Sequence, residues 1–142
     1  MMRWMAGMAL VATAWFALPQ GAMAQQTLYA DLGGKEGIAR TVAGMLKIVL
    51  QDARIKDVFR DADLPLLERR LGEQFCVLGG GPCKYTGKDM VIIHEDLGIT
   101  VAQFNALAED LQLALEQQGV PSRVQNRLIA LLAPMQREIV SK

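Results

Sequence analysis

Apolar residues recur at intervals of three and four along almost the whole chain after residue 27, and this spacing most limits how the chain can fold. Side chains at these intervals lie on one face of an α-helix, whereas a half-buried β-strand needs strict alternation of apolar and polar residues. No segment of the sequence alternates in that way. The periodicity therefore predicts an all-α domain whose helices each turn one apolar face inward.

Turn residues divide this periodic sequence into separate helices. Residues 85–96 are predicted to form a loop with one helical turn around His94. In the long helix that follows, the apolar positions begin with Val101 and Phe104, which are expected to face inward. The helices predicted outside this loop cover residues 37–49, 53–59, 64–78, 101–118 and 124–139.

Capping residues and prolines set several of these helix boundaries. Asp63 can accept a hydrogen bond from the first turn of the helix that follows it. The run from Gly79 to Pro82 ends that helix, because glycine and proline do not continue it. Thr100 and Gln103 have the spacing of a capping box. Pro134 is expected to kink the last helix, since it removes a backbone donor.

The first 24 residues have the three parts of a secretory signal peptide. Arg3 supplies the basic start, an apolar run extends from Trp4 to Leu18, and Ala22-Met23-Ala24 has the small residues of a cleavage site. The alternative is an uncleaved anchor, but the run of about 15 apolar residues is shorter than the roughly 20 that a membrane span needs. We therefore expect a signal peptide over 1–24, a mature domain over 25–142, and export, most simply to a bacterial periplasm.

The charge balance of the mature domain argues against two classes of partner. Cleavage would remove Arg3 alone among the charged residues, so the 15 basic residues of the whole chain fall by one while the 15 acidic residues remain. Nucleic acids and anionic membranes attract proteins with clustered positive charge, and this chain has no such cluster. We expect no nucleic-acid partner and no membrane attachment after cleavage.

His94 is the only histidine, and it is the residue with the clearest metal-ligand chemistry. One imidazole nitrogen can bind a metal while the other donates to a backbone carbonyl. A zinc site made from protein side chains alone would need closely spaced ligands that the sequence lacks. A hydrolytic triad is equally unsupported, because His94 would have to serve every serine. From the residues alone, His94 as a metal ligand and His94 as an ordinary loop histidine both remain open.

The two cysteines, Cys76 and Cys83, flank the glycine-proline corner after the third helix. An exported protein can form disulfides, so this pair is a candidate for a bridge that closes a short loop. The alternative is a pair of unpaired thiols that pack as small apolar side chains.

The order of several short motifs resembles that of the group I truncated haemoglobins from about residue 28 to residue 140. This resemblance implies a two-over-two helical sandwich around haem b. The motifs are Leu28-Tyr29-Ala30-Asp31-Leu32-Gly33-Gly34, then Phe59, then Gly80-Gly81-Pro82 with Tyr85-Thr86-Gly87, and then Met90 and His94 followed by Gly98-Ile99-Thr100.

The resemblance also implies roles for individual residues. His94 would be the iron ligand, and Phe59 would pack against the haem. Haem is held by such a ligand bond together with burial of its apolar ring system, which the helical stripes could supply. The other expected haem-wall residues are Leu67, Leu71, Met90, Ile99 and Phe104.

The far side of the expected haem departs from the family pattern. Relatives carry a tyrosine on the second helix and a glutamine or histidine on the third, where this chain has Leu46 and Leu71, with Leu67 beside them. Leucine cannot donate a hydrogen bond to a bound gas. Gln74, one turn further along, is the nearest polar candidate for this distal pocket, while Arg70 is expected to point to solvent.

Three functions remain open for such a haem protein. The first, which the apolar distal residues favour, is reversible binding of dioxygen, nitric oxide or carbon monoxide for transport or sensing, with an unidentified reductant. The second is a haem enzyme that detoxifies nitric oxide or peroxide, although an apolar pocket argues against oxygen activation. The third is a six-coordinate electron carrier, for which Met45, the neighbour of Leu46, would be the second iron ligand.

Overall fold

In the computed structural model, residues 26–141 are described, and the expected signal peptide lies outside them. Within these residues there is no β-strand, so the all-α prediction is confirmed, and no helix among them is long and apolar enough to cross a membrane. The elements are α1 (Leu28–Asp31), α2 (Gly34–Val49), the 3-10 turn η1 (Lys56–Phe59), α3 (Leu64–Leu78), α4 (Met90–His94), α5 (Val101–Gln117), α6 (Ser122–Leu132), the 3-10 turn η2 (Ala133–Met135) and α7 (Gln136–Ile139).

The predicted capping residues begin the helices as expected. The Asp63 side chain accepts a hydrogen bond of 3.1 Å from the amide of Leu66 at the start of α3. At the start of α5, the Thr100 hydroxyl accepts from the Gln103 amide at 3.1 Å, and the Gln103 side chain accepts in return from the Thr100 amide at 3.0 Å. Both predictions are confirmed, because each cap satisfies backbone donors that no helix bond can reach.

Two details differ from the sequence prediction. The short element expected over 53–59 is the 3-10 turn η1, whereas the four-residue helix α1 was not predicted. Val101 was expected to face inward, but it is 48% exposed. Pro134 has the predicted effect, since the last helix changes to a 3-10 turn there and resumes as α7.

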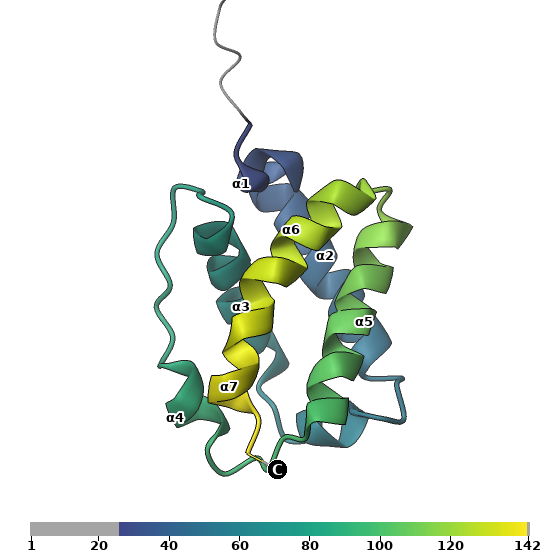
Figure 1. Ribbon diagram of the computed structural model, residues 1–142, viewed down its shortest axis with the longest axis vertical. Helices are drawn as coiled ribbons and strands as arrows, with labels where there is room; N and C mark the ends of the chain where they lie inside the picture. The colour runs from purple at the N-terminus through teal and green to yellow at the C-terminus, as the bar shows by residue number, and fades with distance from the viewer. Residues whose placement is uncertain (1–25, 142) are drawn as a thin grey trace, which may run out of the picture.

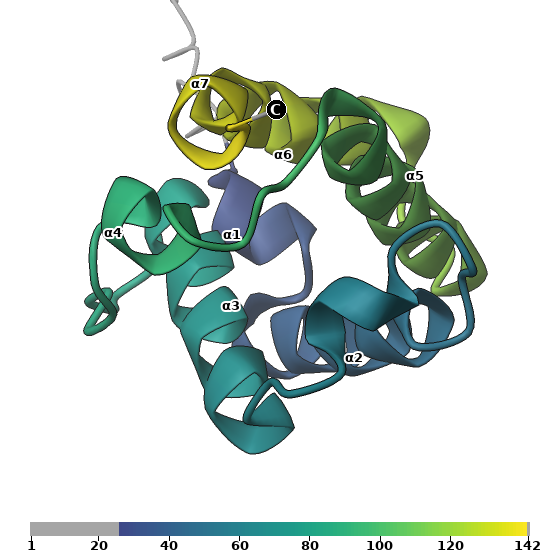
Figure 2. The same ribbon diagram turned by 90° about the horizontal axis from the view of Figure 1, so that it is seen from below.

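Helix α2 makes the most extensive helix contacts in the described chain, with α3 and with α5. Seen from below, α3 and α5 lie on opposite sides, with α2 along one edge and α6 with α7 along the other (Figure 2). The apolar face of α2 is almost fully buried against these neighbours. The most buried large side chains of this core are Val42, Met45, Val49, Phe75, Leu115, Val124 and Leu128.

The end of the described chain lies against the loop that precedes α5. The amide of Ser141 donates to the carbonyl oxygen of Ile99 at 3.0 Å, and α7 packs against α4 and α5 (Figure 1). Segments about forty residues apart in sequence, around Ile99 and Ile139, therefore meet at one end of the molecule.

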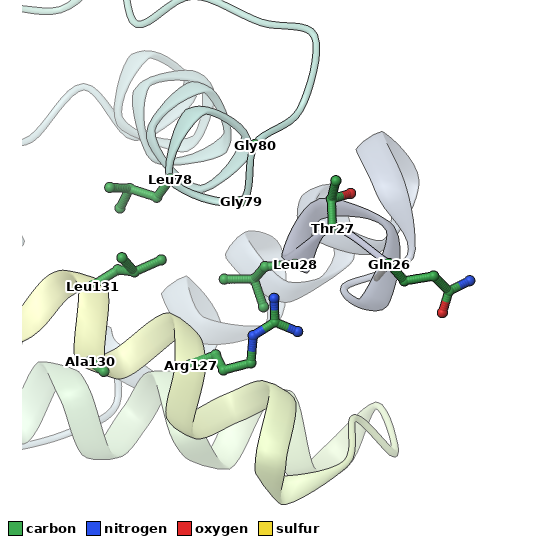
Figure 3. A pocket seen from close by; sticks show the side chains of 9 residues that line it. All are labelled: Gln26, Thr27, Leu28, Leu78, Gly79, Gly80, Arg127, Ala130 and Leu131. Carbon is green, nitrogen blue, oxygen red and sulfur yellow. The ribbon is translucent and has the colours of Figure 1, made fainter. Parts of the chain in front are cut away.

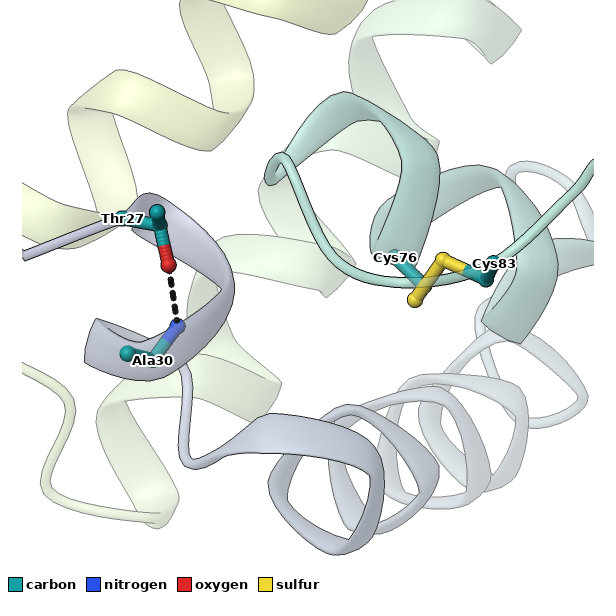
Figure 4. The surroundings of a disulfide bond; sticks show 4 residues. All are labelled: Thr27, Ala30, Cys76 and Cys83. Atoms are coloured by element: carbon teal, nitrogen blue, oxygen red, sulfur yellow. Dashed lines mark hydrogen bonds between the residues drawn. A yellow bond between two sulfur atoms is a disulfide. The ribbon is translucent and has the colours of Figure 1, made fainter.

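Cys76 of α3 and Cys83 of the following loop form a disulfide, with their Cα atoms 6.2 Å apart (Figure 4). The chain turns sharply between them at Gly80, whose φ of 76° is a left-handed conformation that favours glycine. The same region is tied to α1, because the amide of Tyr29 donates to the carbonyl of Gly79 at 2.8 Å. Thr27 caps the start of α1, and its hydroxyl accepts from the Ala30 amide.

Candidate functional site

A cavity of about 680 Å³ opens between η1, α3, α4 and α5, and it contains the only histidine. Its volume lies within the usual range of small-molecule and cofactor sites. Some of its apolar side chains are widely open to water, and Leu97 is 51% exposed. The apolar residues on its wall are Ile55, Val58, Phe59, Ala62, Leu66, Leu67, Ile93, Leu97, Ile99, Phe104, Leu107 and Ile139.

His94 stands at the end of the short helix α4, and its ring is held in one orientation. The ring atom Nδ1 lies 2.7 Å from the carbonyl oxygen of Met90. Because a carbonyl can only accept, Nδ1 carries the proton and Nε2 keeps its lone pair. The start of α4 is set by Asp89, whose side chain accepts from the Val91 amide at 2.8 Å. The local structure thus prepares one imidazole nitrogen for binding a metal.

Three polar side chains on the cavity wall already have partners elsewhere in the protein. Arg70 forms an ion pair with Glu73 at 3.0 Å and also contacts the Thr86 hydroxyl. The Tyr85 hydroxyl donates to a backbone carbonyl at 3.1 Å, and the Gln103 amide belongs to the capping box of α5. Each of these side chains therefore has at least one partner within the protein, while Arg70 and the Gln103 amide nitrogen keep further donors. Burial raises the pKa of the Tyr85 hydroxyl, which keeps that group neutral.

Five of the residues that the sequence singled out come together on this wall: Phe59, Leu67, His94, Ile99 and Phe104. The other residues expected to contact the haem or to form the distal pocket do not line the cavity. Met45 and Leu46 are buried in the core, and Leu71 packs against that core from α3. Met90 contributes its carbonyl to His94, while its side chain faces Gln74.

Two expectations about polar residues are corrected by the structure. Gln74 does not line the cavity, because its amide nitrogen lies 3.6 Å from Met90 Sδ and 3.5 Å from Met135 Sδ. It contacts the sulfurs of α4 and η2 instead of pointing toward a ligand. Arg70 was expected to point to solvent, but its side chain is only 27% exposed and lies on the cavity wall.

Several wall residues were missed by the sequence analysis because they lie in loops. Periodicity detects the buried face of a helix, and it carries no information about Tyr85, Thr86, Lys88 or Leu97. The Tyr85-Thr86-Gly87 motif supported the family resemblance, and it was the one signal that could have placed this loop on the wall.

A cluster of charged residues connects the segment after α2 to α5, next to the cavity residue Ile55. Arg54 pairs with Asp52 at 2.7 Å and with Glu109 at 2.5 Å, and lies 3.8 Å from Asp110. Asp110 is 4% exposed, and its Oδ2 atom has no partner. Burial raises the pKa of Asp110, whereas hydrogen bonds from Arg54 lower the pKa of Asp52.

A second hollow, of about 560 Å³, lies between α1, the end of α3 and α6 (Figure 3). Leu78 and Leu131 point toward one another across it, and Arg127 on its wall pairs with Asp31 at 2.7 Å. No histidine, cysteine or carboxylate lines it. In residues 26–141 no group of three or more histidine, cysteine and carboxylate side chains could hold a metal ion. The cavity with His94 is therefore the candidate site.

The cavity with His94 fits a haem on three counts. It is large and apolar, as a porphyrin ring requires, and its single imidazole presents a free Nε2 as an iron ligand needs. Arg70 and Lys88 on its wall supply positive charge for acidic groups.

Comparisons with known proteins give matches along nearly the whole described chain. Residues 27–141 match the family described as Bacterial-like globin. The chain is 31% identical over 115 residues to the group 1 truncated haemoglobin GlbN of Mycolicibacterium paratuberculosis, covering 81% of this chain and 85% of that protein. Its structure is similar to the ferric truncated haemoglobin of Tetrahymena pyriformis, with a TM-score of 0.79, 29% identity, and coverage of 82% of this chain and 100% of that one. It is also similar to the 2/2 haemoglobin of Synechococcus, which has a covalently attached haem, with a TM-score of 0.73, 26% identity, and coverage of 79% and 94%.

Proposed function

This chain belongs to the bacterial-like globins and is a group 1 truncated haemoglobin with a two-over-two helical fold and haem as its cofactor, and from this premise we propose that it reversibly binds dioxygen and other diatomic gases at a haem iron ligated by His94. Both the expected fold and the expected cofactor are confirmed by the family. The identity of the gas and the roles of individual residues form the proposal.

The orientation of His94 is the observation that carries the proposal. The bond from Nδ1 to the Met90 carbonyl makes Nε2 the free nitrogen, and it raises the basicity of the ring toward a metal. Haem iron supplies the open coordination position at which a small gas binds reversibly. His94 is the only imidazole in the sequence, so no other histidine could take this role.

The apolar wall would hold the haem and exclude water from it. Phe59, Ile99 and Phe104 reach the cavity from three different segments, and burial of an apolar ring against them contributes about 25 cal/mol for each Å² removed from water. Leu71 and Met90 do not line the cavity, and they would support Leu67 and His94, which do.

The pocket offers little hydrogen bonding to a bound gas. Leu67 lines the wall formed by α3, Arg70 pairs with Glu73, and the Oε1 atom of Gln103 accepts within the capping box. Gas binding with weak polar stabilisation suits the reversible uptake of dioxygen, nitric oxide or carbon monoxide, and it disfavours oxygen activation. The structure favours neither alternative function. Met45, the candidate second ligand of an electron carrier, is 1% exposed within the core and does not line the cavity.

Absorption spectra of the purified protein test the proposal. We expect a five-coordinate spectrum for the ferrous protein, conversion to new species with dioxygen and with carbon monoxide, and recovery of the first spectrum when the gas is removed. A six-coordinate, low-spin ferrous spectrum without added gas would contradict gas binding and would favour electron transfer. Rapid irreversible oxidation under air would favour an enzyme.

The cellular location is a separate part of the proposal, and it rests on residues 1–24. These residues precede the family match, which begins at residue 27, and they have the composition of a signal peptide. We expect export to the periplasm after cleavage before Gln25, and a reductant in that compartment. Expression of the full chain, cell fractionation and N-terminal sequencing test this. A protein that keeps Met1 in the cytoplasmic fraction would contradict it.

A further inference from the structure

The loop between α3 and α4, residues 79–89, is attached to α3 by a covalent bond near its beginning. The Cys76–Cys83 disulfide joins the two, and the Gly81 amide also donates to the Cys76 carbonyl at 2.8 Å. The backbone at Gly81 packs closely against its neighbours. A Cβ atom on Gly81 would lie 2.5 Å from the Tyr29 ring and 2.7 Å from Cys76 Sγ. This end of the loop therefore has little freedom while the disulfide is intact.

A second attachment holds the same loop further along. The Glu73 carboxylate accepts from the Thr86 amide at 2.9 Å and from the Thr86 hydroxyl at 2.9 Å, and it pairs with Arg70. The hydrogen bond from the Thr86 amide lowers the pKa of Glu73, so the carboxylate stays charged. Residues 73 and 76 lie three apart in α3, so both attachments lie on one face of the helix.

The loop carries a part of the cavity wall. Tyr85, Thr86, Gly87 and Lys88 all line the cavity, and the first of them follows Cys83 by only two residues. A restraint at Cys83 therefore limits how far this wall can move away from the cavity. If the disulfide opens, the contact between Glu73 and Thr86 is left as the attachment next to the wall.

We propose that the Cys76–Cys83 disulfide is a thiol-reducible lock on the loop 79–89, and that its reduction by a dithiol speeds the loss of haem. The inference rests on the proposed haem site. One thiolate of the dithiol attacks a sulfur of the disulfide, which forms a mixed disulfide and releases one cysteine thiolate. The second thiol of the dithiol then displaces the other cysteine. The dithiol is oxidised to a cyclic disulfide, and two electrons and two protons pass to Cys76 and Cys83.

The disulfide is reachable for this exchange. Cys76 and Cys83 are each partly exposed, and Cys76 also packs against the core. The disulfide closes a short loop, and the fully buried Phe75 of α3 is held by core contacts that do not depend on it. We therefore expect reduction to release the loop without unfolding the domain.

Transfer of haem to excess apomyoglobin measures the lock. The ferric protein is compared before and after treatment with dithiothreitol, alongside the double variant Cys76→Ser/Cys83→Ser. We expect the reduced protein and the double variant to lose haem about tenfold faster than the oxidised protein, a difference equal to about 1.4 kcal/mol. Dithiothreitol should not accelerate haem loss from the double variant. The proposal would be overturned if the oxidised protein, the reduced protein and the double variant lost haem at equal rates. It would also be overturned if dithiothreitol accelerated haem loss from the double variant as much as from the oxidised protein.

The second attachment provides a sharper test. With the disulfide intact, Glu73→Gln should change the rate of haem loss little, because the covalent bond still holds the loop. In the Cys76→Ser/Cys83→Ser background, the same change should speed haem loss several-fold. This non-additivity is expected when two contacts restrain one segment. Strictly additive effects would show that the disulfide and Glu73 act independently, and would contradict the lock.

A measurement without haem separates this inference from the proposed function. Trypsin cleaves after Lys84 and Lys88, which are both exposed in the loop. In protein prepared without haem, we expect cleavage at these sites to be slow when Cys76 and Cys83 are oxidised and faster after reduction or in the double serine variant. Failure of haem uptake would contradict the proposed function alone. Unchanged cleavage after reduction would contradict the lock alone.

Discussion

Helix α2 and helix α4 differ in what they contribute to this protein. Helix α2 has 16 residues, seven of which are buried, and it contacts both α3 and α5. Helix α4 has five residues, none of which is buried, yet it carries His94. The first helix supplies the apolar burial that stabilises the fold, and the second supplies the group that we propose as the iron ligand. Stability and haem binding should therefore respond to different substitutions.

The largest expected effect concerns α4. His94→Ala removes the only imidazole, so we expect no stable haem uptake while the helical content remains that of the wild type. A pyridine haemochrome assay of protein expressed with excess haem measures occupancy, and circular dichroism measures helicity. Glu95→Ala, at the exposed neighbouring position, is the control and should keep its haem. Wild-type occupancy with an unchanged spectrum in His94→Ala would remove the iron-ligand assignment.

For the core that surrounds α2, we expect a substitution to lower the stability of the fold. Phe75 of α3 is 2% exposed in this core, and Phe75→Ala should lower the free energy of unfolding by about 3–5 kcal/mol. Val77→Ala is a control on the same helix, because Val77 is 42% exposed and its loss should change stability by less than about 0.5 kcal/mol. Urea unfolding of the two variants at equal haem loading compares them. Similar midpoints would show that the burial in the structure does not govern stability.

An intermediate effect is expected at the place where the stable core borders the cavity. Leu67→Gln would put an amide donor on the cavity wall, and we expect it to slow oxygen release by about 10–100-fold while changing carbon monoxide release little. Leu67→Met keeps the position apolar, and should leave both rates close to the wild type. Leu46→Tyr is a poorer test, because Leu46 is buried in the core and a larger side chain would strain it. Stopped-flow displacement measures the rates. Slow oxygen release from the wild type would show that a polar donor already reaches the gas.

The smallest expected effect concerns Asp110, the buried carboxyl group on α5. Its pKa is raised by burial, so the stability linked to it is present below the pKa of the unfolded chain and is lost as the pH rises through the folded pKa. Asp110→Asn removes this loss. We expect it to raise the free energy of unfolding by up to about 1 kcal/mol at pH 7, with the gain shrinking near pH 4.

Glu109→Gln provides the matched control for this pH effect. Glu109 is exposed and pairs with Arg54, so its neutralisation should slightly lower stability at pH 7. Urea midpoints measured between pH 4 and pH 8 compare the two variants. A loss of stability in Asp110→Asn at pH 7 would mean that the charged form of Asp110 is favoured through Arg54.

Most of the helical framework could be predicted from the sequence, because local signals specify it. Asp63, Thr100 and Gln103 cap helices through contacts within three residues, and Pro134 acts on its own helix. Val101 shows the limit of such reasoning. It continues the apolar stripe of α5, but it stands in the first turn of that helix and remains 48% exposed.

The site could be predicted only in part, because its wall combines segments that are distant in sequence. Phe59 and His94 were predicted from the family motifs, and Phe104 from the apolar stripe of its helix together with the resemblance. Gln74, the nearest polar candidate for the distal side, does not line the cavity, because its amide contacts the sulfurs of Met90 and Met135. The direction of that amide depends on where α4 and η2 pack, and neither position can be read from the residues of α3.

The bond between Ser141 and Ile99 has a consequence for the order of events during synthesis. In sequence order the wall of the cavity begins with Ile55 and is completed by Ile139, so it stays incomplete until residue 139 has left the ribosome. Contacts between such distant segments form only after the intervening loops have closed. The core around α2 can begin to collapse during translation, whereas the complete cavity forms only once residues 139–141 are available. Stable capture of the cofactor is therefore expected after these segments have emerged, as a late step in the maturation of this globin.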